Sequence, residues 1–423
     1  MVDIQDVEIH RNNNNSVYIR RVEKLSVFLK GMFMKLINAK IHTMDDNDTV
    51  IKNGYIVISE GKITEVGEME NNTNNTDDVI DIQGLNIYPG FIDAHTHLGI
   101  FGDSVDFEGA DGNEDTDPIT PQLRVTDGIN PLDGYFQEAV RGGVTTVMVS
   151  PGSTNPIAGQ IAAVKTYGKR IDHMIIKDPA AIKFALGENP KSTYNDKGQS
   201  PITRMAIASL IRETLTKAKK YYSDKMLFLQ NNSKYDMPEY DAKYEALIPL
   251  FKKEIPAHFH AHRADDIFTA LRLAEEFDIN AVIVHATDGH LIYEELKDEC
   301  VGILSGPILT DRSKPELKNL TPASPGILSK NDIPTAIITD HPEIPIQYLP
   351  LCAAVAVREG MHESAALKSI TINAAKICGI ADRVGSVENG KDADLVIFNG
   401  EPLDIKNKPV SVIINGKIVY DFL

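Results

Sequence analysis

The sequence predicts an α/β protein that consists of a (β/α)₈ TIM-type barrel and a small β-sandwich domain formed by both chain ends. Both ends of the chain contain short strand-like runs separated by tight turns. Between them, strand-like and helix-like runs alternate over about 290 residues, which is typical of a parallel sheet closed into a barrel. Histidine and aspartate residues recur at the ends of the apolar runs, where the active site of such a barrel lies.

The β-sandwich is predicted from two separate segments, residues 34–88 and residues 385–423. In the first segment, two apolar runs flank a turn at Gly61. In the second, Asn415-Gly416 separates two apolar runs, which is a strong hairpin signal. Because both segments have the character of a sheet, we expect them to pair into one domain.

The barrel is predicted to span residues 89–384. The helix-like run that follows residues 257–262 carries apolar side chains at helical spacing from Ile267 to Phe277. The expected barrel strands include the runs 145–149, 181–186, 257–262, 281–285, 301–304 and 335–339.

Composition and charge limit the class of protein. The chain has 423 residues, of which 42% are hydrophobic and 24% charged, as in soluble globular proteins. A net charge of −17 argues against sequence-independent nucleic-acid binding and against an anionic membrane surface as a partner. The 3 dispersed cysteines and the lack of an apolar run of about 18 residues indicate reduced thiols, no membrane span and a cytoplasmic location. Homo-oligomerisation stays open.

Residues 1–33 differ from the rest of the chain. They contain the run Asn12 to Asn15 and scattered charges, and we expect a poorly ordered N-terminal extension. Asp3 and Asp6 argue against a secretory signal. The alternative is an edge strand or helix packed on the body of the protein.

His95 and His97 follow the apolar run 87–94 and are the most informative feature of the chain. A strand alternates its side chains with period two, so both imidazoles point to the same side. Two neutral imidazoles at the end of a strand form half of a metal site.

Histidines and an aspartate also end later strands. The strand at 257–262 carries the alternating histidines His258, His260 and His262. His285 ends the next strand, and Asp340 ends the last. Because the carboxyl ends of barrel strands converge, we expect these side chains to surround a divalent metal. Nitrogen and oxygen ligands suit zinc, with roughly one or two ions per chain.

These motifs resemble the metal-dependent amidohydrolase superfamily, and in detail its imidazolonepropionase-like branch. The resemblance covers nearly everything from residue 35 onward. It is carried by the run 89–97 (Pro-Gly-Phe-Ile-Asp-Ala-His-Thr-His), the later histidine-bearing strands, the run 339–341 and the C-terminal run 385–396. It implies a barrel plus a β-sandwich assembled from both chain ends, in agreement with the pattern of the residues.

The resemblance also implies a metal-ligand set. His95 and His97 would bind the more buried ion, whereas His260 and His285 would bind the second. Asp340 would contact a metal and handle protons.

In binuclear relatives, a carbamylated lysine on the fourth strand bridges the ions. Lys183 matches that position best, and its carbamate would supply the anionic oxygens that an ammonium lacks. Lys165 and Glu188 are competing assignments, and an unmodified lysine on the barrel rim is an equal alternative for Lys183.

The expected function is that of an amidohydrolase that cleaves a carbon–nitrogen bond of a small molecule, namely a cyclic amide, an N-acyl bond or a dipeptide-like bond. A metal ion lowers the pKa of bound water toward about 7 and so supplies hydroxide at neutral pH. Asp340 would act as general base and then as general acid. The second ion, or His262, would polarise the scissile carbonyl.

Two other functions stay open. Nucleobase deaminases of the superfamily typically carry a glutamate three residues after the fifth-strand histidine, where this chain has Arg263 after His260. That departure counts against a deaminase. The second alternative is a non-catalytic relative, although none of the expected ligand histidines is missing.

The substrate is poorly specified by the sequence. Arg124, Lys191 and Arg263 could bind a substrate carboxylate, and salt bridges within the rim are the competing use of each. The long acidic segment 99–142 is either a lid or a solvated surface excursion.

Overall fold

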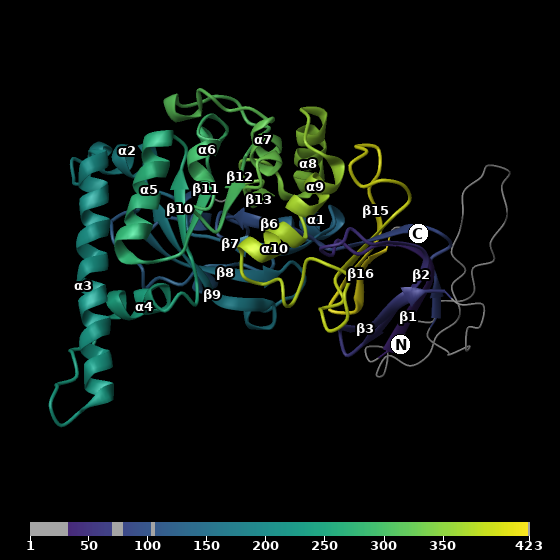
Figure 1. Cartoon of the computed structure of the whole chain (residues 1–423), viewed down its shortest axis with the longest axis horizontal. Helices are drawn as coiled ribbons and strands as arrows, with labels where there is room; N and C mark the ends of the chain where they lie inside the picture. The colour runs from purple at the N-terminus through teal and green to yellow at the C-terminus, as the bar shows by residue number, and fades with distance from the viewer. Residues whose placement is uncertain (1–32, 70–78, 103–105, 422–423) are drawn as a thin grey trace.

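The computed structural model describes residues 33–69, 79–102 and 106–421, which form a barrel and a β domain side by side (Figure 1). The N-terminal extension expected at residues 1–33 lies outside the described residues, except for Phe33, which begins the first strand. In the described part of the chain, no helix combines the length and the apolar character needed to cross a membrane.

Eight strands form the barrel sheet, in the order β13-β12-β11-β10-β9-β8-β7-β6. The first and last strands meet beyond their carboxyl ends, where the His97 N–H donates to the His341 carbonyl oxygen over 2.8 Å. The chain therefore adopts the predicted α/β barrel. The strands are β6 (Phe91–Thr96), β7 (Val144–Val149), β8 (Ile157–Lys165), β9 (Ile175–Ala185), β10 (Ala257–Ala261), β11 (Ala281–His285), β12 (Gly302–Ser305) and β13 (Thr335–Ile337).

Strand β8 departs from the expected alternation of strand and helix. It runs antiparallel to both β7 and β9, so these three strands follow one another directly. Strand β8 was not predicted from the sequence, because Ala158, Gly159, Ala162 and Ala163 have low strand propensity. The strand is nevertheless buried almost throughout, so its place in the sheet is fixed by tertiary packing.

Helices cover the outside of the barrel (Figure 1). The helix predicted from Ile267 to Phe277 is confirmed, and its apolar face is buried against β10 and β11. The α-helices are α1 (Gly134–Arg141), α2 (Glu188–Asp196), α3 (Arg204–Gln230), α4 (Ala242–Phe251), α5 (Ala264–Phe277), α6 (Tyr293–Leu296), α7 (Ser324–Lys330), α8 (Leu349–Arg358), α9 (Glu363–Ser369) and α10 (Ile372–Ile377).

Both ends of the chain build the second sheet, in the order β16-β15-β14-β5-β1-β2-β3, with β4 beside β1. Strand β5 pairs antiparallel with β14, which places Tyr88 opposite Val396 and confirms that the two ends form one β domain. The strands are β1 (Phe33–His42), β2 (Val50–Ser59), β3 (Lys62–Glu68), β4 (Val79–Asp81), β5 (Asn86–Pro89), β14 (Leu395–Phe398), β15 (Pro409–Ile414) and β16 (Lys417–Asp421).

The hairpin predicted at Asn415-Gly416 joins β15 and β16. Asn415 has a φ of 49° and Gly416 has a φ of 71°. Two successive positive φ values match the type I′ turn that the Asn-Gly pair favours.

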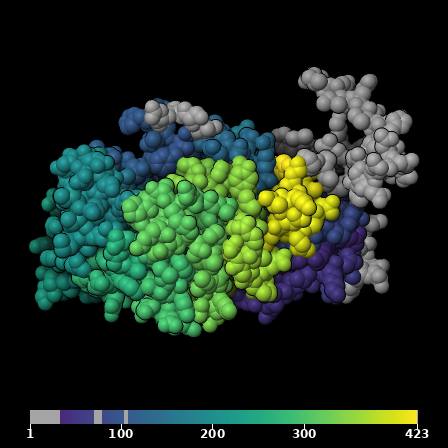
Figure 2. All heavy atoms as spheres, turned by 90° about the horizontal axis from the view of Figure 1, so that it is seen from above, coloured from purple at the N-terminus to yellow at the C-terminus, as the bar shows by residue number. Residues whose placement is uncertain are grey.

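Buried ion pairs join the barrel to the β domain. Lys165, at the end of β8, contacts Asp392 over 2.9 Å and also contacts Asp394, and all three side chains are almost fully buried. Arg383 donates hydrogen bonds to both carboxylate oxygens of Asp392. Figure 2 shows the C-terminal residues, in yellow, beside N-terminal residues of the β domain, in purple, at one end of the molecule.

We propose the domain division expected from the sequence, with residues 34–88 and 385–423 in the β domain and residues 89–384 in the barrel. The sheets support it, because β5 ends at Pro89 and β6 begins at Phe91.

Candidate metal centre

Strand β6 brings His95 and His97 to the carboxyl end of the barrel. His97 Nδ1 lies 2.7 Å from the Ser150 carbonyl oxygen. A carbonyl only accepts hydrogen bonds, so Nδ1 carries the proton and Nε2 keeps its lone pair. Each histidine directs Nε2 toward Asp340, with Nε2–Oδ1 distances of 3.3 Å for His95 and 3.4 Å for His97.

Asp340 lies just beyond β13, and its backbone has a φ of 55°. This left-handed conformation is uncommon for residues other than glycine and is concentrated at functional sites. The buried Oδ1 atom of Asp340 receives no hydrogen bond within the described residues. Three ligand atoms, from His95, His97 and Asp340, lie within 4.8 Å of one another. A carboxylate oxygen and two imidazole lone pairs so arranged fit a divalent cation.

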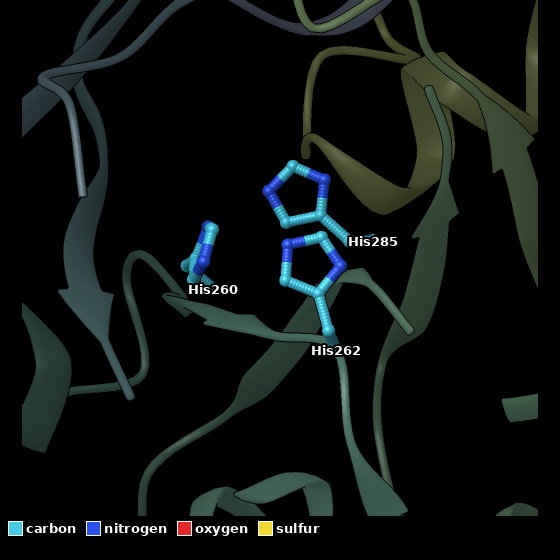
Figure 3. A group of neighbouring side chains, drawn as sticks. All are labelled: His260, His262 and His285. Carbon is cyan, nitrogen blue, oxygen red and sulfur yellow. The ribbon is translucent and has the colours of Figure 1, made fainter. Parts of the chain in front are cut away.

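A second group of ligand atoms lies close by, on β10 and β11. His260, His262 and His285 offer nitrogens that lie within 4.8 Å of one another (Figure 3). The His285 ring centroid lies 4.5 Å from that of His260 and 4.5 Å from that of His262. His285 Nδ1 donates to the Gly306 carbonyl oxygen over 2.7 Å, which leaves Nε2 as the ligand atom.

Lys183 lies beside the first group. It projects from β9 with no solvent exposure, and its Nζ lies 3.2 Å from His95 Nε2. Burial lowers the pKa of Lys183 to about 8, so the neutral amine becomes accessible near neutral pH.

The two competing assignments lie elsewhere. Lys165 is held by Asp392 and Asp394 at the opposite end of the barrel from His95. Glu188 lines a separate cavity of about 420 Å³, and its backbone N–H donates to Glu316.

Burial keeps the imidazoles neutral, which is the form that binds metals. It lowers the pKa of His95, His260 and His262 well below the usual value, and that of His285 to about 4. Burial alone raises the pKa of Asp340, but the nearby histidines outweigh this effect and hold it well below its usual range. The site therefore presents one carboxylate and several neutral imidazoles.

The structure thus brings together the seven side chains that were predicted as metal ligands or catalytic groups: His95, His97, Lys183, His260, His262, His285 and Asp340. His258 does not join them as a ligand. It is fully buried on β10, and neither of its ring nitrogens has a hydrogen-bond partner among the described residues.

A cavity of about 550 Å³ opens over both groups. Several polar residues that line the cavity were not predicted from the sequence, notably Asn189 and Lys314. Asn189 lies in the short helix α2 and Lys314 in an irregular segment, so neither follows an apolar strand-like run. Segment 99–142 contributes Phe101 and Asn113 to the lining.

The charged residues that the sequence analysis offered for a substrate carboxylate do not line this cavity. Arg124 pairs with Asp178 over 2.6 Å, and Arg263 pairs with Asp265 over 2.8 Å. Lys191 faces the separate cavity beside Glu188.

A barrel that carries one group of two imidazoles and a carboxylate and a second group of three imidazoles, at the carboxyl ends of its strands, has the donor set of a metal-dependent hydrolase. A family model described as the amidohydrolase family matches residues 86–419, and the chain belongs to this family. Its members include hydrolases of carbon–nitrogen bonds, and the chain also resembles the imidazolonepropionase-like branch.

Three similar proteins illustrate this relationship. The crystal structure of an amidohydrolase from Thermotoga maritima MSB8 is 42% identical, with a TM-score of 0.87, and the match covers 92% of this chain and 100% of that one. "Amidohydrolase tasK" of Hapsidospora irregularis is 28% identical over 87% of this chain, which spans only 40% of that relative's length. The imidazolonepropionase of Fusobacterium nucleatum is 23% identical over 90% of this chain and 95% of its own.

Proposed function

We propose that the protein hydrolyses a carbon–nitrogen bond of a small molecule: a cyclic amide, an N-acyl bond or a dipeptide-like bond. The observation that carries the proposal is the contact of Asp340 with both His95 and His97, opposite the second imidazole group. This arrangement combines a base for water with ligands for a divalent ion at one end of a cavity.

The ligands of the proposed metal are divided between the two groups. His95, His97 and Asp340 would hold one ion, and His260 and His285 would hold a second. Zinc fits the nitrogen-rich donor set. When bound, such an ion acidifies water and polarises the scissile carbonyl.

Lys183 would complete the site as a carbamate. Its neutral amine adds to carbon dioxide, which forms one N–C bond and releases one proton. The resulting carbamate oxygens would bear the negative charge that an ammonium group cannot offer beside His95, to which Nζ is already close.

Asp340 would carry the proton during turnover. Its low pKa keeps it ionised at neutral pH, so that it can accept a proton from the attacking water. The same carboxyl group would then deliver the proton to the leaving nitrogen. His262 would donate a hydrogen bond to the carbonyl oxygen, and the Thr287 hydroxyl, 2.8 Å from His262 Nδ1, would orient the ring.

A deaminase is the second candidate, because a short segment of the chain is similar to a deaminase. A 5-methylthioadenosine/S-adenosylhomocysteine deaminase of Halothermothrix orenii is 47% identical over 60 residues, although these are only 14% of this chain. Ammonia release from aminated heterocycles distinguishes this activity from amide hydrolysis.

The proposal is tested with zinc-reconstituted protein and a panel of lactams, N-acyl amino acids and dipeptides. We expect turnover of at least one of these classes. Asp340→Asn is expected to retain metal, because its amide keeps an oxygen at the position of the carboxylate, and to lose turnover, because the amide cannot accept the proton. Unimpaired turnover in Asp340→Asn would remove Asp340 from its role. A panel without turnover, together with ammonia release from a heterocycle, would favour the deaminase.

A further inference from the structure

Lys314 is the one lysine or arginine among the described residues that line the cavity over the two ligand groups. It follows β12 in the chain, and its side chain is 33% exposed. The other charged lining residues, apart from the histidines, are the acids Asp196, Asp340 and Glu343. A single cation in the wall of a reaction cavity is a natural partner for an anionic group of the substrate.

The hydrogen bonds of Lys314 connect it to the metal centre. Its Nζ donates to Asn189 Oδ1 over 2.8 Å. The amide nitrogen of Asn189 lies 3.4 Å from His260 Nε2 and donates to Ser153 Oγ over 2.7 Å. Asn189 therefore bridges the ammonium group and one of the proposed metal ligands, which places Lys314 beside the proposed metal centre.

Lys314 retains donor capacity for a ligand. An ammonium group has three N–H donors, and two are directed to Asn189 Oδ1 and, over 3.3 Å, to Glu316 Oε1. No other partner of Lys314 occurs within the described part of the chain. The contact with Glu316 balances the charge of that carboxylate. It does not explain why the Lys314 side chain is exposed to the cavity.

The cavity lining favours a polar ligand. Hydroxyl and amide groups contribute much of it, while Phe101 and Leu317 supply apolar area. The polar lining residues include Asn113, Ser153, Thr154, Asn189, Ser192 and Thr193.

We propose that Lys314, held in place by Asn189, anchors a carboxylate of the substrate. This inference rests on the proposed hydrolysis of a carbon–nitrogen bond and narrows its substrate class. The substrate is a small acid whose carboxylate lies near the scissile bond, such as an N-acyl amino acid or a lactam that carries a carboxylate. A neutral amide leaves the ammonium group without its partner.

The test uses matched pairs of N-acetyl amino acids and their carboxamides with the zinc-loaded full chain. Wild-type protein is expected to favour the acids in kcat/KM by roughly 10- to 100-fold, because a charge-assisted hydrogen bond is lost in the amides. Lys314→Met is expected to abolish this preference by raising KM for the acids, whereas Lys314→Arg retains part of it. Lys318→Met removes an exposed lysine from the same segment and is expected to leave the preference unchanged.

Two further measurements keep the outcomes distinct. Isothermal titration of the same pairs reports Lys314-dependent binding without turnover. The double variant Lys314→Met/Glu316→Gln removes the buried charge that Lys314 balances, in case the single variant is unstable.

If both proteins that carry Lys314→Met turn over the substrates and still prefer the acids to the amides, Lys314 is not the anchor. The proposed hydrolysis would stand in that case. Lys314-dependent binding of the acids would support the anchor even if no compound of the lactam, N-acyl amino acid and dipeptide panel were turned over, which would overturn the proposed hydrolysis alone. A failure to bind either series would overturn the anchor.

Discussion

Asp93 accepts two hydrogen bonds from Thr339, one from its hydroxyl group over 2.5 Å and one from its backbone N–H over 3.2 Å. Asp93 lies on β6 two residues before His95, and Thr339 directly precedes Asp340. The Thr339 hydroxyl also accepts from the His341 N–H over 3.1 Å. This contact ties the first strand of the barrel to the chain after its last strand and fixes the carboxylate of Asp340 relative to the His95–His97 pair.

The hydroxyl of Thr339 is therefore expected to position Asp340. Thr339→Val removes the hydroxyl at nearly constant volume, and we expect kcat to fall by roughly 10- to 100-fold because the base is misplaced. Thr339→Ser keeps the hydroxyl and is expected to stay within about threefold of wild type. Steady-state kinetics on both variants, with zinc content measured in parallel, check this. Equal loss of activity in the two variants would contradict a role for the hydroxyl.

Lys183→Ala is expected to lose metal and activity, because the proposed carbamate cannot form and His95 loses its neighbour. Small carboxylates can occupy the space vacated by the side chain, so propionate is expected to restore part of both. Propionamide, which has the same shape without the charge, serves as the matched control. Full metal content and activity in Lys183→Ala without any additive would show that Lys183 is an ordinary buried lysine.

His260 and His262 are expected to differ although both face the same cavity. His260→Asn should lower the zinc content, because a proposed ligand is lost. His262→Asn should retain most of the zinc and lower kcat by roughly 100-fold, as the loss of a carbonyl-polarising donor does. Elemental analysis and kinetics of the two proteins separate these roles. Loss of zinc from His262→Asn would instead make His262 a ligand of the second group.

Asp392 is expected to make the link between barrel and β domain sensitive to acid. Burial alone raises its pKa, but Arg383, Lys165 and Lys62 outweigh burial and lower it to about 2. A carboxylate with a depressed pKa stabilises the fold above its unfolded pKa, and this stability is lost as the pH falls toward the folded pKa. The contribution is about 2 kcal/mol and should disappear between about pH 5 and pH 2.

Urea unfolding at several pH values measures this contribution. The stability difference between wild type and Asp392→Asn should narrow as the pH falls. Asp332→Asn, at an exposed position, should behave like wild type at every pH. A difference between wild type and Asp392→Asn that does not depend on pH would exclude the proposed linkage.

The features that could be predicted from the sequence depend on local patterns, namely the alternation of side chains in strands and the residue types of tight turns. Strand alternation placed His95 and His97 on one side of β6, and the Asn415-Gly416 turn predicted the last hairpin. Strand β8 was missed because its small residues carry no periodic signal and become strand only through burial between β7 and β9.

The residues that line the cavity could also not be predicted from local sequence patterns. Lys314 and Asn189 lie far apart in the chain, on an irregular segment and a short helix, and their positions depend on hydrogen bonds formed only in the folded barrel. Arg124 and Arg263 looked equally suitable in the sequence. Only the folded structure shows that Arg124 and Arg263 form salt bridges with Asp178 and Asp265.

The central claim is that the two ligand groups hold divalent metal for hydrolysis. Elemental analysis of the full chain, purified with zinc and freed of loosely bound ions, tests it most directly. The two groups predict about two zinc ions per chain in wild type and a clear loss in His95→Asn and His285→Asn. Fewer than about one ion per chain in wild type, unchanged by these substitutions, would contradict the claim.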